Sequence, residues 1–218
     1  MTIAKAISDI QKELPPTTKL VAVSKFKSNE AILEAYSAGL RDFAESRPQE
    51  LKQKISELPK DINWHFIGHL QSNKIKMIID NVALIQSVDN LNLAVEINNE
   101  AFKRSLIKEC LLQVHIANEE TKQGFSETEI FESISELNNL KNIRICGLMG
   151  MASFVDNKQQ IISEFSFLRE LFMGLKEKCF KDCEYFREVS MGMSGDYKLA
   201  IEQGSTIVRI GSKIFSER

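Results

Sequence analysis

The sequence has no run of apolar residues that approaches the roughly 18 needed for a membrane-spanning helix. The N-terminal residues 1–16 also lack the long apolar segment of a signal peptide. Instead, Ile3, Ile7 and Ile10 recur at the spacing of one helix face, which predicts an amphipathic N-terminal helix. We therefore expect a cytoplasmic protein without a membrane partner.

Neither sign of charge predominates. The 28 Lys and Arg residues nearly balance the 30 Asp and Glu residues, and the two signs are interleaved along the chain. This pattern argues against a nucleic-acid partner and against a polybasic membrane contact. Low-complexity segments and linkers are absent as well, and 218 residues are enough for one large core. We expect a single domain over residues 1–218.

Cysteine is scarce, with four residues in the whole chain. Cys110 and Cys146 lie in strand-like apolar stretches, so we expect them in the core. Cys179 and Cys183 are separated by three residues, but no second pair of ligands accompanies them. They are predicted to be ordinary reduced thiols near the end of a helix.

Motifs of several enzyme classes are also missing, including G-x-S-x-G, the Walker motif and a strand-anchored G-x-G-x-x-G. His65 and His69 have a spacing that would suit zinc on a helix, but the surrounding "WHFIGHL" is typical of a strand and a turn. His115 is expected to be a histidine of the core or of its rim. We expect no metal site.

What the sequence does contain is an alternation of strand-like and helix-like segments. At this length, eight such strands favour a closed parallel (β/α)8 TIM-like barrel of class α/β with an extra N-terminal helix. A doubly wound open sheet is the alternative. The expected strands are 19–24, 40–44, 63–67, 83–88, 109–116, 143–149, 185–190 and 206–210. The expected helices are 28–39, 49–58, 72–80, 90–105, 126–137, 158–179 and 195–204, with Ser126 and Glu129 as a capping box.

In such a barrel the active site lies at the carboxyl ends of the strands, so the residues just after each strand are the candidates. They are Lys25, Glu45, Ser46, Gly68, His69, His115, Asn118, Met149, Met151, Ser190 to Ser194 and Arg209 to Ser212.

Lys25 ends the apolar stretch "KLVAVSK", which reads as a buried strand. Partial desolvation at a barrel mouth favours the uncharged amine, which can act as a nucleophile toward a carbonyl and form an imine. The alternative is a lysine that extends from the strand end into solvent.

Two loops of small residues follow the seventh and eighth strands. "VSMGMSGDYK" places Ser194 and Gly195 before a helix, and "TIVRIGSKIF" places Gly211 and Ser212 after Arg209. Such loops are the recurrent phosphate site of these barrels. An amine that captures a carbonyl, together with a phosphate site, suits pyridoxal 5'-phosphate (PLP), whose pyridine nitrogen would give Arg209 a partner.

The motifs "AVSK", "WHFIGHLQSNK", "GLMGMA" and "SMGMSGDYKLAIEQGSTIVRIGSKIF", in this order from about 19 to 215, resemble the pyridoxal phosphate homeostasis protein family. The resemblance implies a barrel of PLP fold type III, similar to the N-terminal domain of alanine racemase. It implies that Lys25 holds PLP as an internal aldimine, a Schiff base, and that Arg209 faces the pyridine nitrogen. The implied phosphate contacts are Ser194, Gly195, Gly211 and Ser212.

One segment departs from the family pattern. Family members usually have "FGENxxQE" after the second strand, whereas this chain has "FAESRPQE" at 43–50. Ala44 stands in place of the glycine. Ser46 stands in place of an asparagine expected near the cofactor, and we keep it as a cofactor-binding candidate.

Two functions remain. A racemase of this fold needs a second base, a tyrosine from a separate β domain, and the sequence ends at Arg218. Of Tyr36, Tyr185 and Tyr197, only Tyr197 is expected near the mouth. We therefore predict a monomeric PLP-binding protein of intracellular PLP homeostasis, which indirectly affects amino and keto acids and supplies apo-PLP-enzymes without strong turnover. The alternative is a PLP-dependent amino-acid racemase or lyase.

Overall fold

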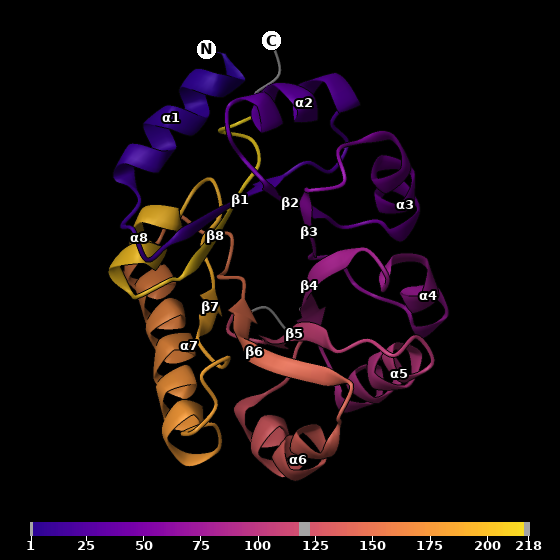
Figure 1. Cartoon of the computed structure of the whole chain (residues 1–218). Helices are drawn as coiled ribbons and strands as arrows, with labels where there is room; N and C mark the ends of the chain where they lie inside the picture. Colours follow the sequence, from indigo (N-terminus) through magenta and orange to yellow (C-terminus); the bar gives the residue numbers. More distant parts are fainter. Residues whose placement is uncertain (1, 118–122, 216–218) are drawn as a thin grey trace.

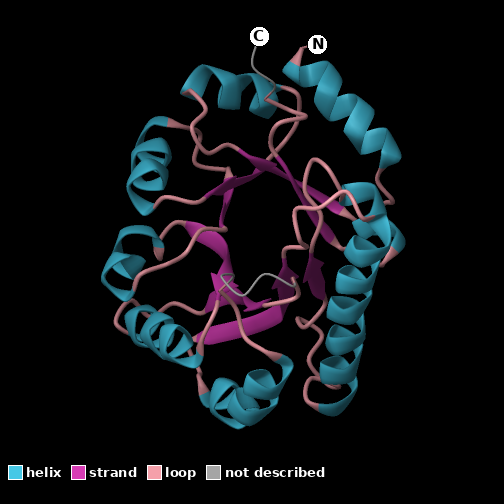
Figure 2. Ribbon diagram, turned by 180° about the vertical axis from the view of Figure 1, so that it is seen from behind, coloured by secondary structure: helices cyan, strands magenta, loops and turns pink. Residues whose placement is uncertain are grey.

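The computed structural model describes residues 2–117 and 123–215; the candidate Asn118 lies outside these residues. Eight parallel strands form a closed barrel in chain order, and β8 pairs with β1. The helices surround this barrel on its outside (Figures 1 and 2). The predicted (β/α)8 barrel is confirmed, and the open doubly wound sheet is excluded.

The elements follow the predicted alternation. The strands are β1 (Lys19–Val23), β2 (Asp42–Glu45), β3 (Asn63–Phe66), β4 (Val82–Val88), β5 (Lys108–Val114), β6 (Ile143–Gly150), β7 (Glu188–Ser190) and β8 (Ile207–Ile210). The helices are α1 (Ile3–Glu13), α2 (Asn29–Ser37), α3 (Pro48–Glu57), η1 (Ser72–Lys74), α4 (Ile75–Ile78), α5 (Leu91–Phe102), α6 (Glu127–Asn139), α7 (Lys158–Lys178) and α8 (Tyr197–Glu202).

Strand β7 begins later than predicted, at Glu188 and not at 185. The apolar residue that suggested an earlier start is Phe186, which is fully buried outside the barrel. Its ring stacks on Phe172 at 4.9 Å and on Phe180 at 4.1 Å between centroids. Phe186 therefore packs against the end of α7, and its apolar character does not reflect strand pairing.

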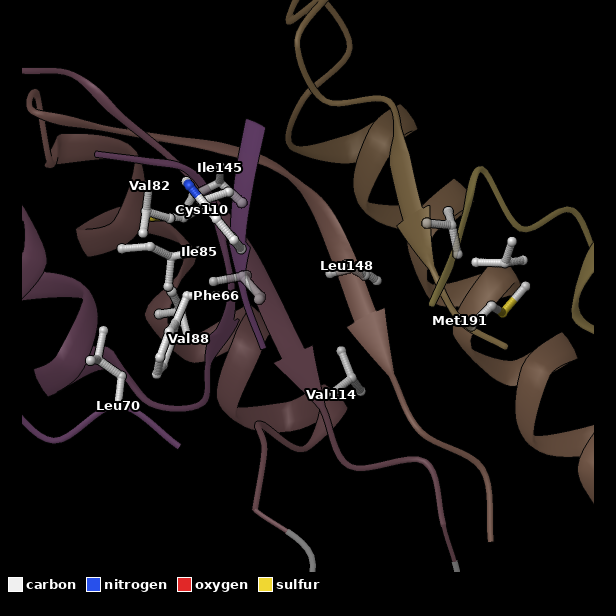
Figure 3. Close-up of a cluster of buried hydrophobic side chains, with 14 of the residues drawn as sticks. Phe66, Leu70, Val82, Ile85, Val88, Cys110, Val114, Ile145, Leu148 and Met191 are labelled. Atoms are coloured by element: carbon white, nitrogen blue, oxygen red, sulfur yellow. The ribbon is translucent and has the colours of Figure 1, made fainter. Parts of the chain in front are cut away.

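The core has two layers. Inside the barrel, Val21, Ala44, Leu111 and Ile207 belong to one small apolar cluster. A larger outer layer fills the space between strands and helices, and Figure 3 shows a part of it that includes Phe66, Leu70, Val82, Ile85, Val88 and Cys110. On β1, Leu20 and Ala22 belong to the outer layer, whereas Val21 faces inward. This period of two decides which residues line the barrel mouth.

The two core cysteines are buried as predicted, and Cys179 caps the end of α7. All four thiols are free. Burial raises the pKa of Cys146 to about 12 and raises that of Cys110 as well. Both thiols are therefore uncharged apolar side chains at neutral pH. Over the described part of the chain, no helix has the length and apolar character to span a bilayer.

The capping box of α6 gives a test of local stability. The Ser126 hydroxyl accepts the Glu129 main-chain N–H, and the Glu129 carboxylate accepts the Ser126 N–H. We expect Ser126→Ala to lower the free energy of unfolding by about 1 kcal/mol, measured by urea titration. Ser135→Ala, at an exposed position inside the same helix, should cost nothing because alanine is the better helix former. An equal loss in both variants would contradict this account.

Candidate functional site

A cavity of about 630 Å³ opens at the carboxyl ends of the strands. All seven residues predicted to bind a cofactor line it, although they come from four different strand ends. Apolar side chains form much of its wall, so a ligand with a flat ring would find both polar and apolar contacts. The lining residues are Val23, Lys25, Ser46, Ile67, Met149, Met151, Phe154, Met193, Ser194, Gly195, Asp196, Arg209, Gly211, Ser212 and Lys213.

Strand geometry explains why these residues meet. Val21 faces the barrel interior, so Val23 and Lys25 follow on the same side of the chain. On β8, Ile207 faces inward, and Arg209 and Gly211 follow with the same period. Residues that are far apart in the sequence therefore share one mouth because β1 and β8 are paired neighbours.

Lys25 differs in one respect from the sequence expectation. Its side chain is exposed at the cavity wall and not partly buried. The residues on each side of it are held more firmly. Ser24 is fully buried, and Phe26 has a φ of 62°, a left-handed conformation that is uncommon for a bulky residue. The amine is thus accessible while its backbone position is constrained.

The loops after β7 and β8 present main-chain donors to the cavity. The Ser194 hydroxyl accepts the Gly211 N–H at 3.3 Å, which ties the two loops together. Within residues 2–117 and 123–215, nothing accepts the N–H groups of Ser194, Gly195 and Ser212. These three donors line the cavity and suit an anion such as a phosphate.

The helix after this loop contributes less than the sequence suggested. We expected it to begin near residue 195, but α8 begins at Tyr197 and ends at Glu202. The reason is Asp196, whose carboxylate accepts the Met193 N–H at 2.5 Å and holds the preceding residues in a turn. The candidate anion donors are therefore loop N–H groups, and a six-residue helix adds little dipole.

Arg209 lies on the cavity wall with only 3% of its surface exposed. Its guanidinium donates to the Ser190 hydroxyl at 2.6 Å and to the Gly150 carbonyl at 3.0 Å. Burial lowers the pKa of Arg209 to about 10, and the charge of Asp196 opposes this shift. Arg209 is therefore a cation at neutral pH, and two of its five N–H donors are used in these bonds.

A chain of hydrogen bonds connects Arg209 to the other end of the barrel. The Ser190 hydroxyl donates to Gln86 Oε1 at 2.6 Å, and Gln86 Nε2 lies 2.8 Å from His65 Nδ1. His65 Nε2 then lies 3.1 Å from Asp42. Since Arg209 can only donate, every bond in the chain donates in the same direction, and His65 carries its proton on Nε2. The chain fixes the guanidinium without placing a carboxylate against it.

The other histidines lie elsewhere. His65 is buried inside the barrel, whereas His69 is half exposed and lies 3.1 Å from Asp89. His115 and Met151 border a separate small hollow near the end of β5. Over the described residues, no three His, Cys, Asp or Glu side chains are grouped closely enough to hold a metal ion.

None of the three tyrosines lines the cavity. The Tyr36 hydroxyl donates to Asp61. The Tyr197 hydroxyl donates to Glu13 of α1. This side chain therefore points away from the barrel mouth, although the sequence predicted it near the mouth. Tyr185 borders a different hollow together with Lys19 and Asp42, at the opposite ends of the strands. The cavity therefore has no tyrosine that could serve as a second base.

Comparison with known proteins agrees with the motifs. The family model of the alanine racemase N-terminal domain matches residues 2–218. The pyridoxal phosphate homeostasis protein of Synechocystis is 41% identical over 213 residues, which cover 97% of this chain and 96% of the relative. The chain belongs to the pyridoxal phosphate homeostasis protein family. The family predicted from the motifs is confirmed.

Solved structures of similar proteins have the same barrel. PipY of Synechococcus elongatus, solved without PLP, matches 99% of this chain and all of its own with a TM-score of 0.94 at 33% identity. PipY with PLP bound matches with a TM-score of 0.90 at 32% identity. Alanine racemase of Clostridium difficile shares only the fold, with a TM-score of 0.76 at 15% identity over 56% of its chain.

Of the two residues that depart from the pyridoxal phosphate homeostasis family pattern, Ala44 lies within β2 and Ser46 directly follows it. Ala44 is fully buried in the cluster inside the barrel, and β2 continues past it to Glu45. Ser46 lines the cavity. Its carbonyl lies against Gly68, where an added Cβ would approach the Ser46 oxygen to 2.1 Å. Gly68 therefore holds the ends of β2 and β3 close together at the mouth.

The sequence did not reveal the hydrogen-bond chain behind Arg209. Gln86 and His65 are polar residues within the short strand-like stretches of β4 and β3, and that is the one signal that could have indicated it. Their partners could not be read from the sequence, because the pairing of β3 with β4 shifts in register between Trp64 and His65.

The hydrogen-bond chain from Arg209 to Asp42 can be tested through Gln86. Replacement by leucine leaves His65 Nδ1 and the Ser190 hydroxyl without their partner, so Gln86→Leu should lower the free energy of unfolding by about 1–3 kcal/mol in a urea titration. Gln113→Leu is the control, because Gln113 donates to the carbonyl of the exposed Gln123, which water can satisfy. A smaller loss of unfolding free energy for Gln86→Leu than for Gln113→Leu would contradict the hydrogen-bond chain.

Proposed function

We propose that this chain is one PLP-binding barrel domain over residues 1–218 that holds PLP for intracellular PLP homeostasis and indirectly affects amino and keto acids. The observation that carries the proposal is the single cavity that unites an accessible lysine, free loop N–H groups and a buried arginine. Relatives named pyridoxal phosphate homeostasis protein, and PipY with PLP bound, support it. When bound, PLP would supply an aldehyde that captures an amine as a Schiff base and a ring that withdraws electrons.

The donor set suits each part of that ligand. Ser194, Gly195 and Ser212 have N–H groups free for a phosphate, and Gly211 lies in the same tied loop. Lys25 supplies the amine for the aldehyde. Arg209 supplies N–H donors for the ring nitrogen, and Ser46 borders the same cavity.

The same residues favour the holding of PLP over catalytic turnover. A guanidinium donates and cannot accept, so it holds a ring nitrogen in its unprotonated form, which weakens the ring as an electron sink. No tyrosine lines the cavity to act as a second base. A racemase of this fold would need such a second base.

The lysine can be tested by absorption spectroscopy. Purified protein mixed with PLP should turn yellow, with a visible band that is lost in Lys25→Ala. Lys27→Ala is the matched control, because Lys27 lies two residues away and does not line the cavity. A wild-type protein without a band, or a band that survives in Lys25→Ala, would refute the proposal.

The phosphate loop can be tested by adding a negative charge. A Cβ at Gly195 would meet nothing within 4 Å, so Gly195→Asp should fold normally. Its carboxylate should repel the phosphate and weaken PLP binding by about tenfold or more, measured by equilibrium dialysis. Gly174→Asp, where a Cβ on α7 also meets nothing within 4 Å, should leave binding unchanged. Unchanged binding in Gly195→Asp would contradict the phosphate site.

The alternative activity is tested by incubating the PLP-loaded protein with single L-amino acids. We expect racemisation and keto-acid release no faster than with free PLP at the same concentration. Turnover well above that of free PLP would support a racemase or lyase and overturn the carrier role.

The proposed carrier role also implies a cellular location, an oligomeric state and recipient proteins. We propose a cytoplasmic monomer that passes PLP to apo-PLP-enzymes; four free cysteines suit a reducing compartment. The PLP-loaded protein should reactivate an apo-PLP-enzyme in an assay whose matched control separates the two proteins by a dialysis membrane. Light scattering should give a mass near 24.8 kDa. A mass of twice that value would contradict the monomer.

A further inference from the structure

Directly behind the loop that carries Lys25 lies a second lysine, Lys54 of α3, with only 4% of its surface exposed. Its ammonium donates to Glu45 at 2.7 Å, to Glu50 at 2.7 Å and to the Ser24 carbonyl at 2.9 Å. An ammonium has three donors, and all three are used. Lys54 is therefore fully paired and has no donor left for a ligand.

The partners of Lys54 hold the chain on both sides of Lys25. The Ser24 hydroxyl donates to the same Glu45 oxygen at 2.6 Å, so Ser24 is held through its hydroxyl and its carbonyl. On the other side, the Phe26 N–H donates to the Glu50 oxygen at 2.7 Å. The Lys25 backbone is thus fixed between two tethered neighbours.

The conformation of Phe26 indicates that these hydrogen bonds hold the backbone in a strained conformation. Its φ of 62° is strained for a bulky residue, and such a conformation persists only where the surroundings impose it. Besides the bond to Glu50, the Arg47 guanidinium lies 4.5 Å from the centre of the Phe26 ring. In the described part of the chain, no hydrogen bond holds the Lys25 side chain itself. Its backbone is therefore what sets the direction of the amine.

We propose that Lys54 is a positioning residue, which aligns the Lys25 amine with the bound aldehyde through Glu45 and Glu50. This role rests on the proposed function. In the reaction it serves, the uncharged amine nitrogen forms a bond to the aldehyde carbon. The aldehyde oxygen leaves as water with the two amine protons, so no oxidant or reductant is needed.

The effect of losing Lys54 can be derived from its partners. Glu45 is fully buried, burial raises its pKa, and the bonds from Lys54 and Ser24 oppose that shift. Without the ammonium, Glu45 would take up a proton. Glu50, which is partly exposed, would turn toward solvent and release Phe26. The loop would then sample other positions of Lys25 although the barrel still closes.

The chain contains a matched control for this test. Lys108 of β5 is also buried, and its ammonium donates to the Val82 carbonyl at 2.6 Å. It lies at the start of its strand, at the end of the barrel opposite to the cavity. Lys54→Met and Lys108→Met each remove one buried ammonium, but only the first touches the Lys25 loop.

The experiment mixes each full-length variant with PLP and follows the Lys25-dependent visible band by stopped flow, with urea unfolding measured alongside. Lys54→Met should form the band about tenfold more slowly or worse, and the pH midpoint of the band should shift. Lys108→Met should lose stability but form the band at the wild-type rate. Equal slowing in both variants, or none in Lys54→Met, would overturn the positioning role.

A second pair of variants covers the case in which Lys54→Met does not fold. Glu50→Gln keeps an oxygen that can accept from Phe26, whereas Glu50→Ala removes it. We expect slow band formation in Glu50→Ala and near wild-type formation in Glu50→Gln. Equal rates in both would overturn the role of the tether. A wild-type protein that forms no band would instead overturn the proposed function itself, and this inference with it.

Discussion

The pairing of β8 with β1 is the constraint on which the site depends. Val21 lies opposite Arg209 and Ala22 opposite Ile210 in this pairing. In an open sheet the first and last strands could lie at opposite edges, and Lys25 would then be remote from the loop at Gly211. Closure makes them neighbours, and the period of two along each strand turns Lys25 and Arg209 toward the same cavity. The site is therefore a product of the topology, and no local motif alone could build it.

Closure also forces polar groups into the interior, where each needs a partner. The two buried cations near the mouth are satisfied in different ways. Arg209 donates to a hydroxyl and a carbonyl, and it keeps its charge and its remaining N–H groups for a ligand. Lys54 uses all three of its N–H donors in hydrogen bonds to two carboxylates and a carbonyl. The first arrangement suits a group that contacts the ligand, and the second suits a group that holds the loop beside it.

Much of this architecture could be predicted from the sequence because short apolar runs and helical periodicity alternate eight times. The mouth residues followed from the rule that functional groups lie at the carboxyl ends of barrel strands. Errors arose where an apolar or polar residue has a tertiary partner. Phe186 resembled a strand residue but stacks on Phe172 and Phe180, and Asp196 resembled a helix residue but bonds to Met193.

The interior hydrogen bonds could not be predicted for a related reason. Whether Gln86 reaches His65 depends on the register shift between β3 and β4, and whether Lys54 reaches Ser24 depends on how α3 packs beneath the loop. Neither is encoded in a local pattern of residues. Single polar residues inside apolar strands mark where such a network must exist, but three-dimensional packing decides which partners it joins.

A lysine at the mouth of a barrel of this fold type suggests catalysis, yet the groups around it argue for another role. A racemase that works with two bases needs a second acid–base group at the cavity besides the lysine. Here the neighbour of the proposed ring nitrogen is a cation without an acceptor, and the tyrosine hydroxyls donate to Asp61 and Glu13 or lie at the other end of the barrel. Phe154 at the cavity wall is 97% exposed, so this wall is open to solvent. An accessible amine, a firmly held loop and an open wall together suit the proposed capture and release of an aldehyde.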